Sequence, residues 1–262
     1  MRINELIQPT SIEEAYALLQ EHEDAKIAGG TLWMRLGQHD VERLIVLDGL
    51  GLDTITETND DISIGAMVTL RQLETNPIIQ THLNGMLSRA AGSIMGVQVR
   101  NLATIGGSVI GNYSFSDIIP VLAVMDTTLV FHHQGEVPLD LFLSKRLSEP
   151  DILVAIRIRK QEGRGTVHKI SRTELDFALL NVAVTHTDRW RIAIGSRPAG
   201  AAMATNAMAH LDQADRIDDQ TIATAVELAM EEIKLSSNAK ASQAYRRDLL
   251  SAHLRRALNE VK

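Results

Sequence analysis

The chain has 262 residues, of which 45% are hydrophobic and only 3% aromatic, and its formal net charge is −7. This length allows one large domain or two modest ones, and the negative charge argues against nucleic acid or an anionic membrane surface as the main partner. The absence of cysteine excludes disulfides, cysteine nucleophiles and iron–sulfur clusters held by the chain's own thiolates.

The sequence carries no targeting or metal-binding signal. No apolar run approaches the roughly 20 residues that a membrane-spanning helix needs. Met1–Pro9 has no signal-peptide core, so we expect a cytoplasmic protein. Among nine histidines only His132 and His133 are adjacent. Neighbouring side chains on a strand point to opposite faces, so we expect a solvated strand end there and no metal site.

The N-terminal part of the chain predicts a helix and then a strand that ends in a glycine pair. The helix is expected over Ser11–Glu23, with its cap at Thr10 or Ser11. Lys26–Ala28 is a short strand that runs into Gly29–Thr31 and a helix-like segment. Glycines at such a point allow close approach of a phosphate, which the following N–H groups can bind. The alternative is a strand-to-helix turn in which glycine serves only steric needs.

The next segment predicts two strands and a long helix. Strands are expected at Leu44–Leu47 and Ile62–Ala66, with a polar hairpin or loop at Thr54–Asp61 between them. Apolar residues at helical spacing predict a single helix over Pro77–Gly96. No G-x-G-x-x-G motif follows a strand, so a Rossmann site is not indicated.

The central stretch, Gln98–Val130, combines a glycine motif with a helix start. Thr104–Ser108 reads Thr-Ile-Gly-Gly-Ser, and we expect a turn with positive φ and a concave cluster of exposed N–H groups that suits a phosphate. Ser116 and Asp117 precede Ile-Ile-Pro and an apolar run, which predicts a capped helix. The alternative is a tight turn followed by an ordinary capped helix.

The remainder of the chain predicts strands followed by helices. Leu129–Phe131 and Ile152–Ile158 are expected strands, and Val137–Leu143 a strand end with a short helix. Lys160–Gly165 is a polar, glycine-bearing linker and a candidate domain boundary. Beyond it we expect strands at 166–170, 179–185 and 191–194 and helices at about 202–211, 219–234 and 242–259. This order gives an α+β fold class.

Two glycine motifs at this spacing resemble one known family. The pattern Gln-Val-Arg-Asn-x-Ala-Thr-Ile-Gly-Gly-Ser at 98–108, with Ser-Asp-x-x-Pro-x-Leu at 116–122 and Ala-Gly-Gly-Thr at 28–31, resembles the FAD-binding (medium) subunit of the molybdenum hydroxylases. This is the xanthine dehydrogenase and carbon monoxide dehydrogenase family. Weaker markers are Ile-Gly-Ala at 64–66, Lys-Ile-Ser-Arg at 169–172 and Asn-Val-Ala-Val at 181–184.

The resemblance covers essentially the whole chain and implies its fold. It implies a two-lobed PCMH-type FAD-binding domain over residues 1–162, with lobes of about 1–55 and 56–162. A small C-terminal α+β domain, a three-stranded sheet with helices, would occupy 163–262. One non-covalent FAD would lie in an extended pose between the two lobes.

The resemblance also implies which residues contact the FAD. Two phosphate loops and four separate positions would do so: Lys26, Ile27, Ala28, Gly29, Gly30, Thr31, Leu32 and Trp33; Thr104, Ile105, Gly106, Gly107 and Ser108; and Ile94, Asp117, Leu153 and Lys169. Asp117 would hydrogen-bond the sugar-alcohol chain or the adenosine side, and Lys169 would reach toward the flavin, where a cation can stabilise the reduced anion. The alternatives are purely structural roles: core packing for Ile94 and Leu153, an N-cap for Asp117 and a surface position for Lys169.

Three departures from the family pattern bear on flavin affinity and redox tuning. Leu32 stands where many relatives have an acidic residue, and Ser108 where asparagine is common. Asn-Tyr-Ser-Phe at 112–115 replaces a loop that usually reads Ala-Ser-Pro. The substrate is therefore not assumed to be xanthine.

The implied function is electron transfer within a multi-subunit enzyme. A molybdopterin subunit would oxidise the substrate, and an iron–sulfur subunit with 2Fe-2S clusters would pass electrons to the FAD, which reduces an acceptor such as NAD. The resemblance implies that both metal cofactors belong to partner subunits, and this chain lacks the cysteine that iron–sulfur clusters need. No residue is expected to act as a catalytic acid or base. Two alternatives are a flavin-binding or scaffold protein without turnover of its own, whose altered loops bind FAD weakly or not at all, and a stand-alone FAD oxidoreductase.

Overall fold

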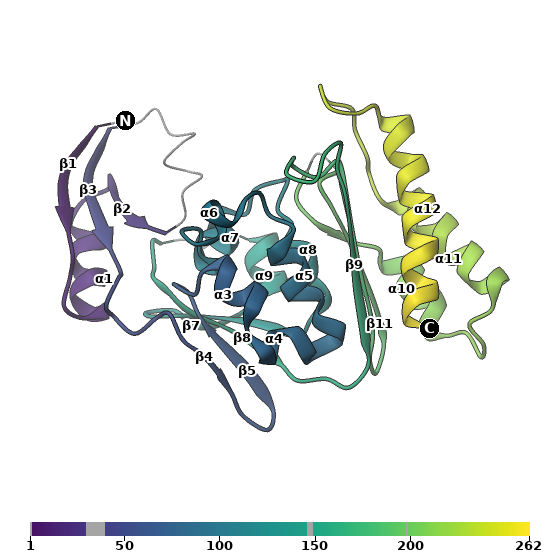
Figure 1. The fold of residues 1–262 in the computed structure, drawn as a ribbon, viewed down its shortest axis with the longest axis horizontal. Helices are drawn as coiled ribbons and strands as arrows, with labels where there is room; N and C mark the ends of the chain where they lie inside the picture. Colours follow the sequence, from purple (N-terminus) through teal and green to yellow (C-terminus); the bar gives the residue numbers. More distant parts are fainter. Residues whose placement is uncertain (1, 30–39, 146–148, 198) are drawn as a thin grey trace. The chain divides into compact units, whose positions relative to one another are not determined.

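A computed structural model describes residues 2–29, 40–145, 149–197 and 199–262 (Figure 1). The chain forms two compact units, each assembled from separate segments. Unit 1 comprises Met1–Gln72, Val97–Gly111 and Thr127–Arg159. Unit 2 comprises the remaining segments, Leu73–Gly96, Asn112–Asp126 and Lys160–Lys262. Two segments of the predicted FAD-binding domain therefore belong to the same unit as the C-terminal residues.

In its described residues, the N-terminal part of unit 1 is a parallel sheet with helix α1. Strands β1 (Ile3–Ile7), β2 (Ala25–Ala28) and β3 (Val41–Val46) pair in the order β1-β3-β2, and helix α1 (Ile12–Glu21) lies between β1 and β2 in sequence. The Ser11 hydroxyl accepts the N–H of Glu14 at 3.1 Å, so Ser11 is the helix cap. The helix and strands predicted here are confirmed.

The rest of unit 1 is built on a five-stranded antiparallel sheet of order β4-β5-β8-β6-β7. Buried and partly exposed residues alternate along the strands at 61–65 and 127–131, as a sheet with one covered face requires. The predicted hairpin and the later predicted strands are confirmed. The strands are β4 (Ile55–Glu57), β5 (Asp61–Gly65), β6 (Thr127–Phe131), β7 (Gly135–Pro138) and β8 (Leu153–Arg159), and the helices are α6 (Val97–Arg100), α7 (Ile105–Gly111) and α9 (Leu139–Ser144), with α3 (Leu70–Thr75) at the border of the unit.

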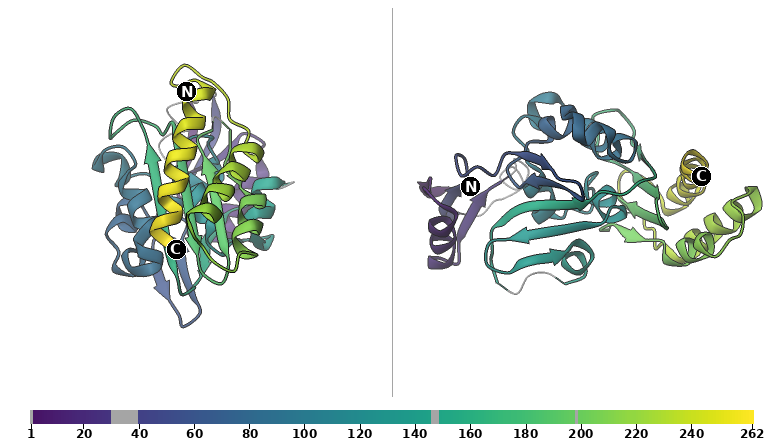
Figure 2. Two further views of the ribbon diagram at one scale, coloured as in Figure 1. Left: turned by 90° about the vertical axis from the view of Figure 1, so that its right-hand side faces the viewer. Right: turned by 90° about the horizontal axis from the view of Figure 1, so that it is seen from below.

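Unit 2 contains a four-stranded antiparallel sheet with helices on both faces. The strands are β9 (Arg164–Ile170), β10 (Leu180–His186), β11 (Trp190–Gly195) and the two-residue edge strand β12 (Ala202–Met203). One face is covered by α10 (Thr205–Asp212), α11 (Asp219–Glu232) and α12 (Gln243–Val261), with α12 lying lengthwise along the strands (Figure 2). The three longer strands and the three helices agree with prediction, whereas β12 is too short to show in the sequence pattern.

The opposite face of this sheet carries the shorter helices of unit 2. Helix α8 (Ile119–Val124) packs on β10 and β11, and α5 (Met86–Gly92) packs on β9. A Cβ atom at Gly195 of β11 would lie closer than 3.0 Å to Pro120. Glycine at that position therefore allows α8 to approach the sheet.

The prediction of one helix over Pro77–Gly96 is wrong. The chain forms α4 (Pro77–Thr81), a 3-10 turn η1 (His82–Gly85) and then α5. Leu83, Asn84 and Gly85 have φ values of 46°, 59° and 65°, which end the first helix. A Cβ at Gly85 would lie 2.5 Å from the carbonyl oxygen of Gln80. The break escaped prediction because buried residues continue at helical spacing on both sides of it.

None of the helices in the described part of the chain is long and apolar enough to cross a membrane.

Candidate functional site

Strand β10 has an apolar face and a polar face. Leu180, Val182 and Val184 alternate along it and belong to the core beneath the three C-terminal helices. Asn181 and Thr185 point the other way, toward α8, and both have no exposed surface. A buried polar side chain is costly unless it is hydrogen-bonded, so these two residues identify where the polar contacts of unit 2 lie.

Asp117 and Lys169, two predicted flavin contacts, form a buried ion pair in unit 2. The Lys169 Nζ lies 3.0 Å from Oδ2 of Asp117, and the two side chains are 11% and 8% exposed. The Lys169 ammonium also donates to the carbonyl oxygen of Ser93 at 2.7 Å. An ammonium has three N–H donors, and the described residues occupy two of them.

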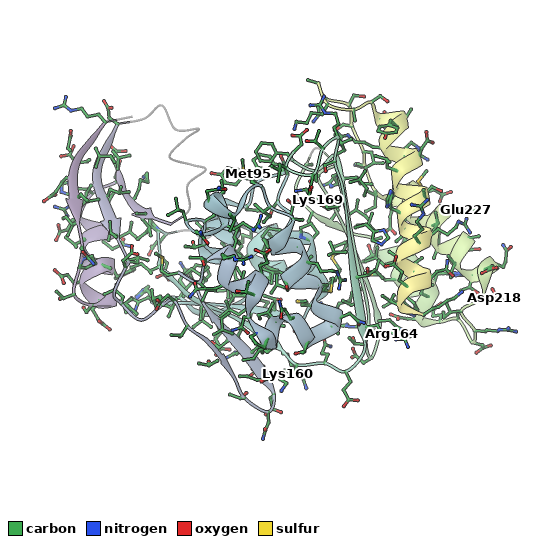
Figure 3. All side chains as sticks on the ribbon, in the orientation of Figure 1. Met95, Lys160, Arg164, Lys169, Asp218 and Glu227 are labelled. Atoms are coloured by element: carbon green, nitrogen blue, oxygen red, sulfur yellow. The ribbon has the colours of Figure 1, made fainter. Side chains whose placement is uncertain are left out.

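The sheet register brings both partners of Asp117 to the same place. Lys169 on β9 pairs directly with Asn181 on β10, and directly opposed residues of antiparallel strands project from the same face. The amide Nδ2 of Asn181 donates to Oδ1 of Asp117 at 2.9 Å, so each carboxylate oxygen has one protein partner. Lys169 lies toward the end of β9 opposite to Arg164 (Figure 3).

Burial raises the pKa of Asp117, whereas the Lys169 ammonium and the Asn181 amide act to lower it. The direction shows that loss of solvation outweighs the two partners, so this carboxylate binds a proton more readily than an exposed aspartate does. The alternative that Asp117 serves only as a helix cap does not hold. Its carboxylate binds Lys169 and Asn181, and the hydroxyl of Ser116 accepts the N–H of Ile119 at 3.2 Å.

Ile94 lies next to this ion pair along the chain. It follows Ser93, whose carbonyl binds Lys169, and it precedes Met95, which has a left-handed φ of 43°. Met95 and Lys169 lie at the same end of unit 2 (Figure 3). Ile94 is partly buried, which is compatible with both packing and an exposed contact surface. Unit 2 thus brings together three predicted contacts, at positions 94, 117 and 169.

The expectation of a donor-rich turn at Thr104–Ser108 is wrong. This segment begins helix α7, and neither Gly106 nor Gly107 has a positive φ. A Cβ at Gly106 would lie 2.6 Å from the carbonyl oxygen of Ala66, so packing requires glycine there. The N–H groups of the first turn already have acceptors, which are Val68 O, Ala66 O, Thr104 Oγ1 and Thr104 O for residues 105 to 108 in order. What the segment retains for an anion is the positive end of a short helix.

Unit 1 also holds the other described residues of the predicted contact set. Strand β2 carries Lys26–Ala28, and the Lys26 ammonium donates to the carbonyl of Glu23 at 3.1 Å. Leu153 begins β8 and is buried in the register position opposite Phe131, which agrees with the core-packing alternative. Gly29 directly follows β2. Outside the described residues lie Gly30, Thr31, Leu32 and Trp33.

The loop that departs from the family pattern forms an aromatic cluster. The rings of Tyr113 and Phe115 stack with centroids 5.3 Å apart, and Phe115 contacts Phe177 at 4.5 Å. The Lys240 ammonium lies 5.1 Å from the centre of the Phe177 ring. This chain has few aromatic residues, and Phe115 lies two positions before Asp117. These ring contacts therefore anchor the loop that carries the carboxylate.

Sequence reasoning missed two buried polar residues behind the ion pair. Arg246 of α12 is fully buried and donates to the carbonyl oxygens of Leu179, Ser196 and Ser236. No carboxylate of the described residues lies within ion-pair distance of it. Ser196 has a left-handed φ of 56°, and its hydroxyl accepts the amide of Asn181 at 3.1 Å. The available signal for Arg246 was its place four residues before Leu250, within the apolar stripe of α12.

Comparison with known proteins covers both parts of the chain. Residues 2–159 match the family described as the FAD binding domain in molybdopterin dehydrogenase, and residues 165–261 match the CO dehydrogenase flavoprotein C-terminal domain. The nicotine 6-hydroxylase medium subunit of Paenarthrobacter nicotinovorans is 28% identical over 273 residues, which cover 97% of this chain and 95% of that protein. Aldehyde oxidase 2 of Cavia porcellus is 28% identical over 224 residues, 80% of this chain and only 15% of that protein.

The fold has a close counterpart among solved structures. A chain of carbon monoxide dehydrogenase from Hydrogenophaga pseudoflava, in a form that lacks the Mo-pyranopterin moiety of its cofactor, superposes with a TM-score of 0.91 at 27% identity. The match covers 100% of this chain and 97% of that one. The fold class predicted from the sequence is confirmed.

Proposed function

Because the chain belongs to the family of FAD-binding domains of molybdopterin dehydrogenases, with the C-terminal domain of the CO dehydrogenase flavoproteins, we propose that it is the electron-transfer subunit of a multi-subunit molybdenum hydroxylase. The subunit would accept electrons from an iron–sulfur partner and deliver them to an acceptor such as NAD. FAD is the family's cofactor, and a flavin supplies both hydride and single-electron chemistry. The residues of this chain supply binding, orientation and the local field.

The observation that carries this proposal is the buried pair of Asp117 and Lys169. Burying two charges costs several kcal/mol per ion before their attraction is counted, and ionisable groups perturbed by burial cluster at functional sites. The pair also fits the chemistry of a flavin. Asp117 can accept a hydrogen bond from a hydroxyl of the sugar-alcohol chain, and Lys169 retains one N–H donor beyond those used by the described residues.

We extend the proposal to the remaining predicted contacts. Lys26–Trp33 and Thr104–Ser108 would hold the pyrophosphate, with support from the positive end of α7 rather than from free N–H groups. Ile94 and Leu153 would contact the flavin ring system. The domain division at 162/163 is likewise proposed, since β8 ends at Arg159 and the matched families end at 159 and begin at 165.

Partner subunits follow from the chemistry that this chain lacks. It has no cysteine to hold an iron–sulfur cluster, so any such cluster that feeds the flavin would belong to another protein. The name of the nicotine 6-hydroxylase relative, a medium subunit, supports such an assembly. We propose one partner with 2Fe-2S clusters and one with molybdopterin.

An absorbance spectrum of the purified chain tests the proposal. The protein is desalted, measured, incubated with FAD, desalted again and measured once more. We expect flavin absorbance at near one-to-one occupancy in the second spectrum. A chain that neither retains nor rebinds FAD would support the scaffold alternative, and Leu32, Ser108 and the 112–115 loop would be the changes to revert.

The proposed phosphate contacts are tested with glycine variants. Gly30→Val and Gly107→Val should abolish flavin retention while leaving the protein soluble. Gly200→Val is the matched control, because a Cβ at Gly200 would meet no atom within 4 Å. Gly51 also has open space around it but is unsuitable, since its φ of 73° disfavours any side chain. Normal flavin content in both loop variants would contradict the phosphate assignment.

A further inference from the structure

The side chain of Asn181 has more acceptors than it has protons. Its amide nitrogen lies 2.9 Å from Oδ1 of Asp117, 3.2 Å from the carbonyl oxygen of Ser116 and 3.1 Å from the hydroxyl of Ser196. An amide group carries two N–H donors. Three acceptors therefore compete for two protons at a residue with no exposed surface.

The amide oxygen of Asn181 has no hydrogen-bond partner in the described part of the chain. A buried acceptor without a partner costs about 1–3 kcal/mol. The reverse orientation of the amide would set this oxygen against the carboxylate of Asp117, which is repulsive while the carboxylate is ionised. The observed orientation thus leaves the amide oxygen without a partner and directs both N–H groups toward Asp117 and its neighbours.

Asn181 and Thr185 bind opposite ends of helix α8. The Thr185 hydroxyl donates to the carbonyl oxygen of Val124, the last residue of the helix, at 2.9 Å. Asn181 instead binds the segment before the helix, at the backbone of Ser116 and the side chain of Asp117. Both residues would anchor α8, but only Asn181 touches a group with proposed flavin contact.

The charged group that binds Asp117 is Lys169 on β9. Arg246 on α12 donates to the backbone carbonyl of Ser196, and Asn181 donates to the hydroxyl of the same residue. Ser196 is therefore fixed from two sides, and its hydroxyl helps to hold the Asn181 amide.

We propose that Asn181 is a positioning residue of the flavin site, which holds the Asp117 carboxylate in one orientation beside Lys169 for contact with FAD. This inference rests on the proposed function. The amide acts through Asp117 and needs no contact with the flavin itself. Its register position opposite Lys169 makes both side chains available to the same carboxylate.

The test compares Asn181→Leu with Thr185→Val in the full chain. Both changes remove a buried polar group from the same face of β10 and keep the number and branching of the side-chain heavy atoms. Each variant is measured for unfolding in urea and for FAD affinity. The titration of Asp117 is followed in the FAD-free protein by carbon NMR of labelled aspartate carboxyls, with Asp117→Asn to assign the signal.

We expect Asn181→Leu to weaken FAD binding about tenfold and to move the Asp117 titration to higher pH. The loss of a donor leaves the ionised carboxylate less stabilised, which is the physical reason for that direction. Thr185→Val should lose stability while its FAD affinity and its Asp117 titration stay at wild-type values. If Asn181→Leu fails to fold, Asn181→Ser serves instead, because its shorter side chain withdraws the donor from the carboxylate.

Unchanged FAD affinity and an unchanged Asp117 titration in the Asn181 variant would overturn the inference and leave Asn181 as a helix anchor like Thr185. A wild-type chain that binds no FAD would instead contradict the proposed function. In that case the Asp117 titration still decides whether Asn181 sets the state of the carboxylate.

Discussion

The two faces of strand β10 show how one element serves stability and site geometry separately. Its residues on the side of α10, α11 and α12 are Leu180, Val182 and Val184, and they belong to the large core of unit 2. Its other face carries Asn181 and Thr185, which hydrogen-bond the segments at the two ends of α8. The apolar face contributes burial free energy that depends on area, whereas the polar face contributes direction. Substitution of Leu180 on one face and of Asn181 on the other should therefore separate loss of folding from loss of binding.

The largest effect is expected on the apolar face. Leu180→Ala should lower the free energy of unfolding by about 2–5 kcal/mol, because it leaves a cavity in a fully buried core. Urea denaturation followed by circular dichroism measures the change. The folded fraction should keep its FAD affinity, and a parallel fall in affinity would show that the two faces are not separable.

A smaller loss is expected where α8 packs on the sheet. Gly195→Ala would place a methyl group against Pro120, and such overpacking costs about 1–3 kcal/mol. Gly200→Ala is the matched control, because no atom lies within 4 Å of the position that its Cβ would take. Thermal unfolding of the two variants gives the comparison. Equal melting temperatures would mean that α8 can shift without cost.

The smallest effect is expected on the pH dependence of the unfolding free energy, at the face of β9 that α12 covers. Burial lowers the pKa of His253, as do the neighbouring His168 and Arg256. A histidine whose folded pKa is depressed binds more protons when unfolded. Its contribution to stability is thus present above the usual histidine value of about 6.5 and is lost as pH falls below it.

His253→Asn should therefore reduce the decline of the unfolding free energy between about pH 6.5 and pH 5. Urea titrations of wild type and variant at several pH values measure the two slopes. His22→Asn, at an exposed position after α1, is the matched histidine-to-asparagine control. If the His253 variant had the same slope as wild type, His253 would not be the source of this pH dependence.

Local patterns predicted most elements, but contacts between distant segments had to come from the structure. Hydrophobic spacing identified β9 to β11 and the three C-terminal helices because each has a continuous buried face. The same spacing concealed the break at Leu83–Gly85, where backbone conformation changes while burial continues. The glycine motif at Thr104–Ser108 was assigned to a turn, although Gly106 lies in a helix. Glycine is needed there because a side chain would clash with Ala66.

The resemblance gave Asp117 and Lys169 as separate flavin contacts, and the sequence did not predict their ion pair. Asp117 and Lys169 are 52 positions apart (169 minus 117), and nothing in either local sequence indicates that they meet. Their meeting depends on the register of β9 with β10, which places Lys169 beside Asn181. A polar pair four residues apart in a buried strand was the available signal for Asn181 and Thr185. Its meaning required knowledge of which helix covers that face.

The most direct test of the central claim is the affinity of the chain for FAD, measured by calorimetric titration of wild type, Asp117→Ala and Asp60→Ala. Asp60 is exposed in the turn between β4 and β5 and controls for the loss of one negative charge. We predict that Asp117→Ala weakens binding by about 1–3 kcal/mol, since it removes hydrogen bonds to a charged group, and that Asp60→Ala matches wild type. Equal affinity in all three proteins would contradict the assignment of Asp117 to the flavin site.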